Sequence, residues 1–303
     1  MTQPIEKVSM PSVEKFVETY IRGNQPVVVT GLDFDADEWK PDALTRRIGD
    51  LTALVYGSLF ELDDVQTLED YVDTWFGLDG DMEDDTPYIR WYNKLRDVEF
   101  AWGDEAFARV ASAWRRPQCL PGNELVVPVS GAGAGTDPVL DAFPYRGLLV
   151  AARGARTRMH RDPFCSDAVV CQFYGTKEAA LYRPERAAEL SKAKDGSSFG
   201  GFIDVREDQI DALSVEPDFH GIVEPGEMIY IPNGWLHDVL AIEDSVSITW
   251  NFVHQRGSAK FQEYLNGAWE SDSEFEILQY FHRATGNPAL SASEIAKLHF
   301  ATT

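Results

Sequence analysis

The chain has 303 residues, of which 44% are apolar or aromatic, and this is enough to bury one large core with smaller attachments. Its formal net charge of −23 repels phosphate backbones, so nucleic acid is not expected as a partner. The longest apolar runs, such as residues 26–31 and 147–152, have the length of strands and are far shorter than the ~20 residues that cross a membrane, so no membrane partner is expected either.

The N-terminal residues lack the basic stretch followed by an apolar one that marks a secretory signal. Only three cysteines occur, Cys119, Cys165 and Cys171, and their spacing is not that of a zinc site. An odd number of cysteines in a chain that is not exported indicates reduced thiols. We therefore expect a cytoplasmic protein.

The first part of the chain predicts a mixture of helices and strands. The elements expected there are a helix over residues 11–22 capped by Ser12, a buried strand over residues 25–31, a helix from Pro41 and a strand near residues 54–56. Residues 79–85 are acidic and indicate a surface loop. The glycine-rich residues 131–135 lack the spacing of a phosphate loop, so we interpret them as a flexible turn.

From Tyr145 to His254 the pattern changes to short β-rich runs separated by turn residues. The clearest runs are residues 145–152, 168–174, 178–182, 228–231 and 246–252. Many short strands without helices between them are typical of a sandwich or a barrel. Residues 184–218 are more polar and are expected to be helical or looped.

After Gly257 the pattern becomes helical. Aromatic and apolar residues recur at helical spacing, namely Phe261, Tyr264, Leu265 and Trp269, and then Phe275, Leu278 and Phe281. So much apolar surface at the end of a chain requires a partner, which is either the barrel or a second subunit.

A metal site is indicated by His160 and Asp162. Residues i and i+2 of a strand point to the same face, so one strand end can offer an imidazole and a carboxylate to a single ion. The best third ligand is His237, which follows a turn at Pro225-Gly226, a short strand and a second turn. Two histidines and one carboxylate on one face are the ligand set of non-haem Fe(II) oxygenases.

The chain has six histidines, so an H-x-D triplet alone is a weak signal. His220, His282 and His299 have no carboxylate at ligand spacing in a β-turn-β setting, and we interpret them as surface or hydrogen-bonded residues. His254 lies just past the final strand and is expected to support either the site or the fold.

Two blocks of sequence resemble the cupin-like JmjC oxygenases. The first runs from His160-Arg-Asp-Pro-Phe through Gly175-Thr-Lys to Tyr182-Arg-Pro, and the second from Gly234-Trp-Leu-His to Ile248-Thr-Trp-Asn-Phe. Their spacing is most similar to the Jumonji-type lysyl hydroxylase branch of that family. The resemblance covers residues 11–254 and implies a jelly-roll barrel, that is, a double-stranded β-helix.

The resemblance also implies a 2-oxoglutarate site. Lys177 stands where the family places the base that pairs with the distal carboxylate, and burying a lysine without an anionic partner is costly. Thr157 matches a hydroxyl donor to the same carboxylate, and Asn251 matches an amide near the cosubstrate. Tyr88 matches the family's tyrosine donor, although a core tyrosine is equally compatible with its sequence.

Two departures from the family concern the substrate more than the chemistry. Val170 stands where the closest branch has asparagine, and the residues after Lys177, Glu-Ala-Ala-Leu, are smaller than usual. The implied reaction uses Fe(II), 2-oxoglutarate and O₂ to hydroxylate a side chain of a peptide, protein or amino-acid substrate. The net charge would favour a basic substrate, although it also serves solubility.

Other functions remain open. N-demethylation uses the same iron chemistry. A zinc or manganese isomerase, or a dioxygenase without a cosubstrate, would keep the three ligands but would have no use for Lys177 and Thr157. A non-catalytic binding module typically lacks one ligand.

The prediction is a mainly β barrel with an α/β decoration at its N-terminus and helices at its C-terminus. The oxygenase domain is expected over residues 1–257, with a flanking segment at 1–144 and the core barrel at 145–257. Residues 258–303 are expected to form a helical segment that builds a homodimer.

Overall fold

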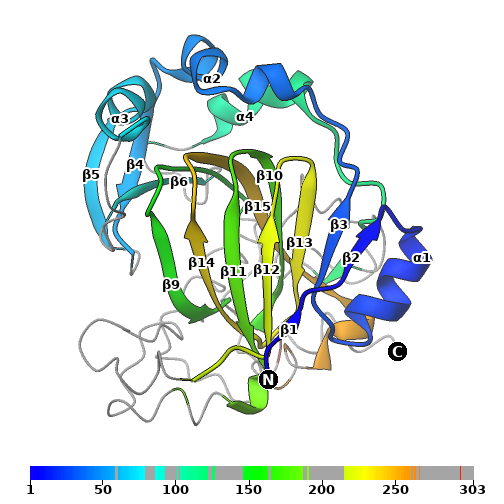
Figure 1. Cartoon of the computed structure of the whole chain (residues 1–303). Helices are drawn as coiled ribbons and strands as arrows, with labels where there is room; N and C mark the ends of the chain where they lie inside the picture. The colour runs from blue at the N-terminus through cyan, green and yellow to red at the C-terminus, as the bar shows by residue number, and fades with distance from the viewer. Residues whose placement is uncertain are drawn as a thin grey trace.

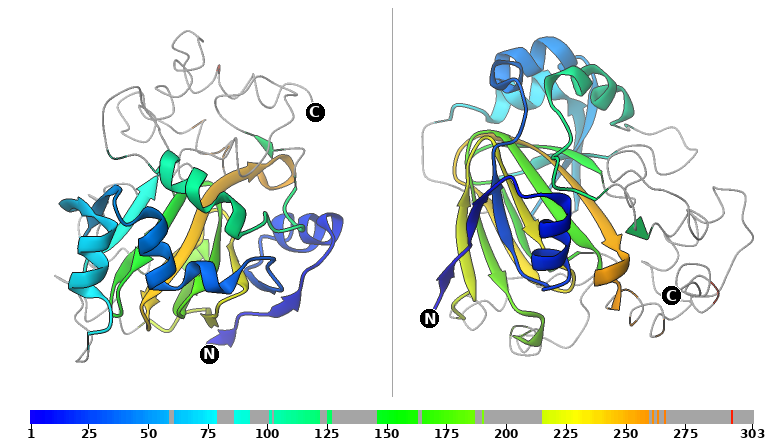
Figure 2. Two further views of the ribbon diagram at one scale, coloured as in Figure 1. Left: turned by 90° about the horizontal axis from the view of Figure 1, so that it is seen from above. Right: turned by 90° about the vertical axis from the view of Figure 1, so that its right-hand side faces the viewer.

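The computed structural model describes residues 1–58, 61–78, 86–92, 101, 103–121, 125–126, 146–162, 165–186, 190 and 215–259, and the single positions 261, 263, 266 and 294. These residues form two β-sheets that face each other, with helices covering the larger sheet (Figures 1 and 2).

The smaller sheet has five strands among the described residues. Their order is β1 (Gln3–Pro4), β12 (Phe219–Val223), β11 (Lys177–Tyr182), β14 (Leu236–Ala241) and β9 (Arg156–Arg161). β9, β14, β11 and β12 pair antiparallel with their neighbours, and the N-terminal β1 joins β12 in parallel. Strands that neighbour in this sheet are thus far apart in the sequence.

The larger sheet carries the remaining strands. Their order is β2 (Lys7–Ser9), β3 (Val27–Thr30), β13 (Glu227–Ile231), β10 (Asp167–Tyr174), β15 (Ser245–His254), β8 (Gly147–Ala151), β6 (Tyr88–Tyr92), β4 (Thr52–Tyr56) and β5 (Leu62–Thr67), while β7 (Leu125–Val126) pairs with β15. Strand β10 pairs antiparallel with β13 on one side and with β15 on the other, as expected for a jelly roll.

The alternation of side chains along β15 explains why the sheet is buried on both faces. Val246, Ile248, Trp250 and Phe252 join the large apolar core on the side of the helices. The residues between them are small and polar, namely Ser245, Ser247, Thr249 and Asn251, and they are also buried. Because neighbouring strand residues point to opposite faces, the polar set faces the space between the two sheets.

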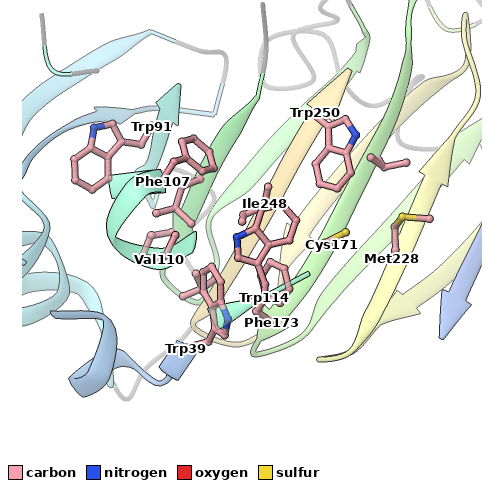
Figure 3. Packing of buried hydrophobic residues seen from close by; sticks show 14 of the residues in the cluster. Trp39, Trp91, Phe107, Val110, Trp114, Cys171, Phe173, Met228, Ile248 and Trp250 are labelled. Atoms are coloured by element: carbon pink, nitrogen blue, oxygen red, sulfur yellow. The ribbon is translucent and has the colours of Figure 1, made fainter. Parts of the chain in front are cut away.

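Helices from the N-terminal half cover the outer face of the larger sheet. They are α1 (Val13–Phe16), which continues as a π-helix over Val17–Ile21, a 3-10 helix at Ala36–Trp39, α2 (Pro41–Ile48), α3 (Leu68–Trp75) and α4 (Asp104–Val110). Trp39 stacks on Phe173 of β10 with 4.3 Å between the ring centroids, and α4 contributes Phe107 and Val110 to the same core (Figure 3).

A second core lies between the two sheets. Its buried residues come from both of them and include Val28, Ala168, Ile229, Ala179 and Leu181. Three further short 3-10 helices occur in the described chain, at Ala111–Ala113, Pro184–Arg186 and Gln255–Gly257. The architecture is therefore the predicted two-sheet barrel with helical decoration.

The expected N-terminal elements are confirmed. Ser12 caps α1 by accepting a hydrogen bond from the backbone N–H of Lys15, and Gly31 ends β3 with φ of 90°. The elements α3, β5 and β12 were not among those expected. In α3 the apolar residues do recur at helical spacing, whereas β5 and β12 show little apolar alternation. The predicted loop at 79–85, the turn at 131–135 and most of residues 184–218 and 258–303 lie outside the described residues. No helix in the described part of the chain is long and apolar enough to cross a membrane.

Candidate metal centre

Two strands of the smaller sheet bring the three predicted ligands together. His160 lies near the end of β9, Asp162 follows that strand directly, and His237 is the second residue of β14. The register of these antiparallel strands sets His160 opposite His237, with their ring centroids 4.1 Å apart. Nε2 of His237 lies 3.7 Å from Oδ2 of Asp162, and one ligand atom from each residue falls within 4.8 Å of the others.

The backbone orients both imidazole rings. Nδ1 of His160 lies 2.8 Å from the carbonyl oxygen of Arg158, and Nδ1 of His237 lies 3.2 Å from that of Trp235. A carbonyl can only accept, so each Nδ1 carries the proton and each lone pair lies on Nε2. Burial, and then the neighbouring His237, hold the pKa of His160 well below its usual value. Each ring therefore offers the lone pair of its Nε2 to a metal.

The donor set fits iron. Two imidazole nitrogens and one carboxylate on one side of an ion leave open positions for other ligands, which is the arrangement of non-haem Fe(II) sites. Among the described residues this is the one group of three or more histidine, cysteine or acidic side chains that could hold a metal ion.

The other histidines that the structure describes lie outside this group. His220 is partly exposed, and its Nε2 lies 2.5 Å from Oε1 of Glu178. His254 is buried at the end of β15 and accepts a hydrogen bond from the backbone N–H of Arg256, 3.1 Å away, so it caps the short helix that follows. His282 and His299 lie outside the described residues.

Lys177 begins β11 and is buried, with 6% of its surface exposed. Its Nζ donates to Oγ of Ser247, 3.0 Å away, and no carboxylate in the described part of the chain pairs with it. Burial, and then the charge of Arg90, lower the pKa of Lys177 to about 8. A buried ammonium with only a hydroxyl partner fits a site for an anionic ligand.

Thr157 and Tyr88 meet across the two sheets. Thr157 on β9 donates from Oγ1 to the hydroxyl of Tyr88 on β6, 3.1 Å away. Tyr88 is almost fully buried, and burial raises the pKa of its hydroxyl. Asn251 on β15 is also buried, and its Nδ2 donates to Oγ of Ser166, 3.1 Å away, in the segment that follows Asp162. All four predicted cosubstrate residues therefore have buried or partly buried side chains on strands of the two facing sheets.

Sequence reasoning missed Ser247. Its hydroxyl is the partner of Lys177, and the signal was present in the alternation of Ser245, Ser247, Thr249 and Asn251 with large apolar residues. A row of small polar residues on one face of a buried strand indicates a polar cavity lining. Arg90, two residues after Tyr88 on β6, was also missed, and its charge lowers the pKa values of both Lys177 and His160.

Comparison with known proteins agrees with this geometry. A family model described as a cupin-like domain matches residues 62–258. The chain is 23% identical over 270 residues to the arginine-specific demethylase JMJ22 of Arabidopsis thaliana, which covers 86% of this chain and 48% of that protein. It is 30% identical over 117 residues to the 2-oxoglutarate and iron-dependent oxygenase JMJD4 of Gallus gallus, covering 36% of this chain and 27% of that protein.

A third relative is the tRNA wybutosine-synthesizing protein 5 of Danio rerio, which is 29% identical over 125 residues, or 39% of this chain and 36% of that protein. The chain spans about half the length of the curated relatives that it matches over most of its own length. The names of these relatives include both oxygenases and demethylases.

Proposed function

The chain belongs to the cupin-like domain family, and from that premise we propose that it is an Fe(II)- and 2-oxoglutarate-dependent oxygenase. The reaction proposed is hydroxylation of a C–H bond in an amino-acid side chain of a peptide, a protein or an amino-acid-derived substrate. The observation that carries the proposal is the buried Lys177 in the same barrel as the His160, Asp162 and His237 triad.

Each side chain has a role that follows from its position. His160, Asp162 and His237 would hold the iron from one side. Lys177 would pair with the distal carboxylate of 2-oxoglutarate, and Thr157 with Tyr88 would orient the same cosubstrate through their hydroxyls. Iron with bound 2-oxoglutarate and O₂ supplies the chemistry, which releases succinate and CO₂ and oxidises a substrate C–H bond. Apolar neighbours such as Ala179 and Leu181 exclude water from the space between the sheets.

N-demethylation is the second candidate. It would use the same three ligands and the same cosubstrate, with oxidation of an N-methyl group followed by loss of formaldehyde. The relatives named arginine-specific demethylases match most of this chain, which favours the idea, and formaldehyde release would distinguish the two reactions. An isomerase or a non-catalytic binding module is less favoured, because neither explains Lys177.

The substrate proposed is a peptide or protein, and we propose a basic one because the net charge of −23 would attract cations. The acidic residues 79–85 and 207–211 that would strengthen this attraction lie outside the described residues. We also propose a cytoplasmic location and a homodimer built by residues 258–303. Neither nucleic acid nor a membrane enters the proposal.

An anaerobic titration tests the function directly. Iron and then 2-oxoglutarate are added to the protein without oxygen, and the visible charge-transfer band of the iron–2-oxoglutarate chelate is followed. A saturable band, and succinate release after oxygen is admitted, are the expected results. Absence of the band at millimolar 2-oxoglutarate would refute the oxygenase assignment.

A further inference from the structure

Asp167, the first residue of β10, is fully buried and joins two distant parts of the chain. Its Oδ1 accepts three hydrogen bonds: from the hydroxyl of Tyr230 at 2.6 Å, from the backbone N–H of Asn233 at 3.0 Å and from Nδ2 of Asn233 at 3.2 Å. These hydrogen bonds connect the segment after Asp162, which contains Asp167, to the turn before His237, which contains Asn233.

Asn233 fastens that turn on several sides. Its Nδ2 also donates to the carbonyl oxygen of Gly257, 3.1 Å away, so both amide protons are used. Asn24 donates to the side-chain and backbone oxygens of Asn233, each at 3.2 Å, and accepts the indole N–H of Trp235. The carbonyl of Trp235 in turn accepts the Nδ1 proton of His237. A continuous set of hydrogen bonds therefore leads from Asp167 to the ring of a ligand.

We propose that Asp167 and Asn233 are positioning residues for the metal, acting through the placement of Asp162 and His237. Asp167 comes five residues after Asp162, and Asn233 four residues before His237, so their contact fixes both ligand-bearing segments to each other. The strand pairing between these segments is irregular there, because the register of β9 and β14 shifts between His237 and Val239. The contact supplies the constraint that this irregular pairing lacks.

The second carboxylate oxygen shows which substitution should be tolerated. Oδ2 of Asp167 is buried and has no hydrogen-bond partner within the described part of the chain. Burial outweighs the three hydrogen bonds and raises the pKa of Asp167 to about 7, so the neutral carboxyl is accessible near neutrality. Asparagine has nearly the shape of the neutral form and keeps the acceptor at Oδ1, and its one unpaired group would be the amide nitrogen in the place of Oδ2. Alanine would leave three buried donors without a partner.

The inference rests on the proposed iron site, and its test measures iron affinity rather than turnover. Fe(II) is titrated anaerobically into wild type, Asp167→Ala and Asp167→Asn, and the thermal midpoint of each metal-free protein is recorded. We expect Asp167→Ala to weaken iron binding by about 10- to 100-fold, the range for residues that orient ligands. Asp167→Asn should remain within about threefold of wild type.

Tyr230→Phe is the matched control. It removes one donor from the same carboxylate but leaves Asn233 attached, so its metal-free midpoint should fall while iron affinity stays within about threefold of wild type. Equal loss of iron affinity in Tyr230→Phe and Asp167→Ala would overturn the inference, because loosening of the core would then explain both.

If Asp167→Ala does not fold, Asn233→Ala takes its place in the test. This variant removes the side-chain amide of Asn233 but keeps the backbone N–H bond to Asp167, so it disturbs the core less. An unchanged iron affinity in the folded variant refutes the positioning role. Failure of wild type itself to bind iron would instead refute the proposed function.

Discussion

His160 and His237 lie directly opposite each other on antiparallel strands, although they are far apart in the sequence. Their rings are 4.1 Å apart, and a backbone carbonyl holds the Nδ1 of each. Asp162 completes the group from the residue that follows β9, so the pairing of β9 with β14 brings all three ligands together.

We expect Asp162→Ala to lose most bound iron and all measurable turnover while the barrel stays folded, because Asp162 is the one anionic ligand of the triad. Metal content after anaerobic loading and succinate release measure the two effects. The control is Asp64→Ala, which removes an exposed carboxylate on β5. Succinate production near the wild-type rate in the Asp162 variant would rule out the triad.

Lys177→Ala should weaken 2-oxoglutarate binding by about 10-fold to a few thousand-fold and leave iron binding nearly unchanged. Removing one partner of a buried charged pair costs about 1.5–5 kcal/mol of binding free energy. Each ~1.4 kcal/mol corresponds to a tenfold change in affinity, which gives this range. Titration of 2-oxoglutarate into the anaerobic iron-loaded protein measures it, with the exposed Lys15→Ala as control. Equal dissociation constants for wild type and Lys177→Ala would remove Lys177 from the cosubstrate site.

The binding of 2-oxoglutarate should also depend on pH. Burial lowers the pKa of Lys177 to about 8 in the protein without ligand, and only the protonated amine pairs with a carboxylate. The dissociation constant should be flat below about pH 7 and rise about tenfold per pH unit above pH 8.

The stability of the ligand-free protein should depend on pH in the opposite direction to 2-oxoglutarate binding. The pKa of Lys177 is lower in the folded than in the unfolded protein, so stability of the ligand-free protein should rise between about pH 8 and 10.5 from this group. Lys177→Met should remove both dependences. A variant with the wild-type pH profile would assign the titration to another group.

A homodimer at micromolar concentration is expected for the full chain, because the helices predicted after Gly257 present apolar stripes. Phe261 is fully buried, so a truncated chain should retain it and end at residue 262. Light scattering of both proteins measures their masses, and the truncated protein should be a monomer. A monomeric full-length protein would contradict the prediction.

Turnover of a basic peptide substrate should fall as the salt concentration rises through ~0.1–0.5 M, since the Debye length then shortens to a few ångström and weakens the attraction between the charges. Initial rates at several peptide concentrations would place the effect on KM rather than on kcat. A preference for acidic peptides, or rates that do not respond to salt, would leave the net charge of −23 as a matter of solubility.

The sequence alone predicted the three candidate ligands and the class of fold. Residues two apart on a strand share a face whatever surrounds the strand, so His160 and Asp162 were predictable as a pair. The alternation along residues 246–252 likewise predicted a buried strand, which the structure has as β15. These patterns depend only on local backbone geometry.

The partners of the site were decided by the tertiary structure. Ser247 beside Lys177, Tyr88 beside Thr157 and Asn233 beside Asp167 are contacts between strands or turns distant in the chain. Which residues meet across a barrel depends on strand order and on register, and a shift of one residue would turn every side chain to the other face. Local propensity carries no information about that register, because packing of the whole core sets it.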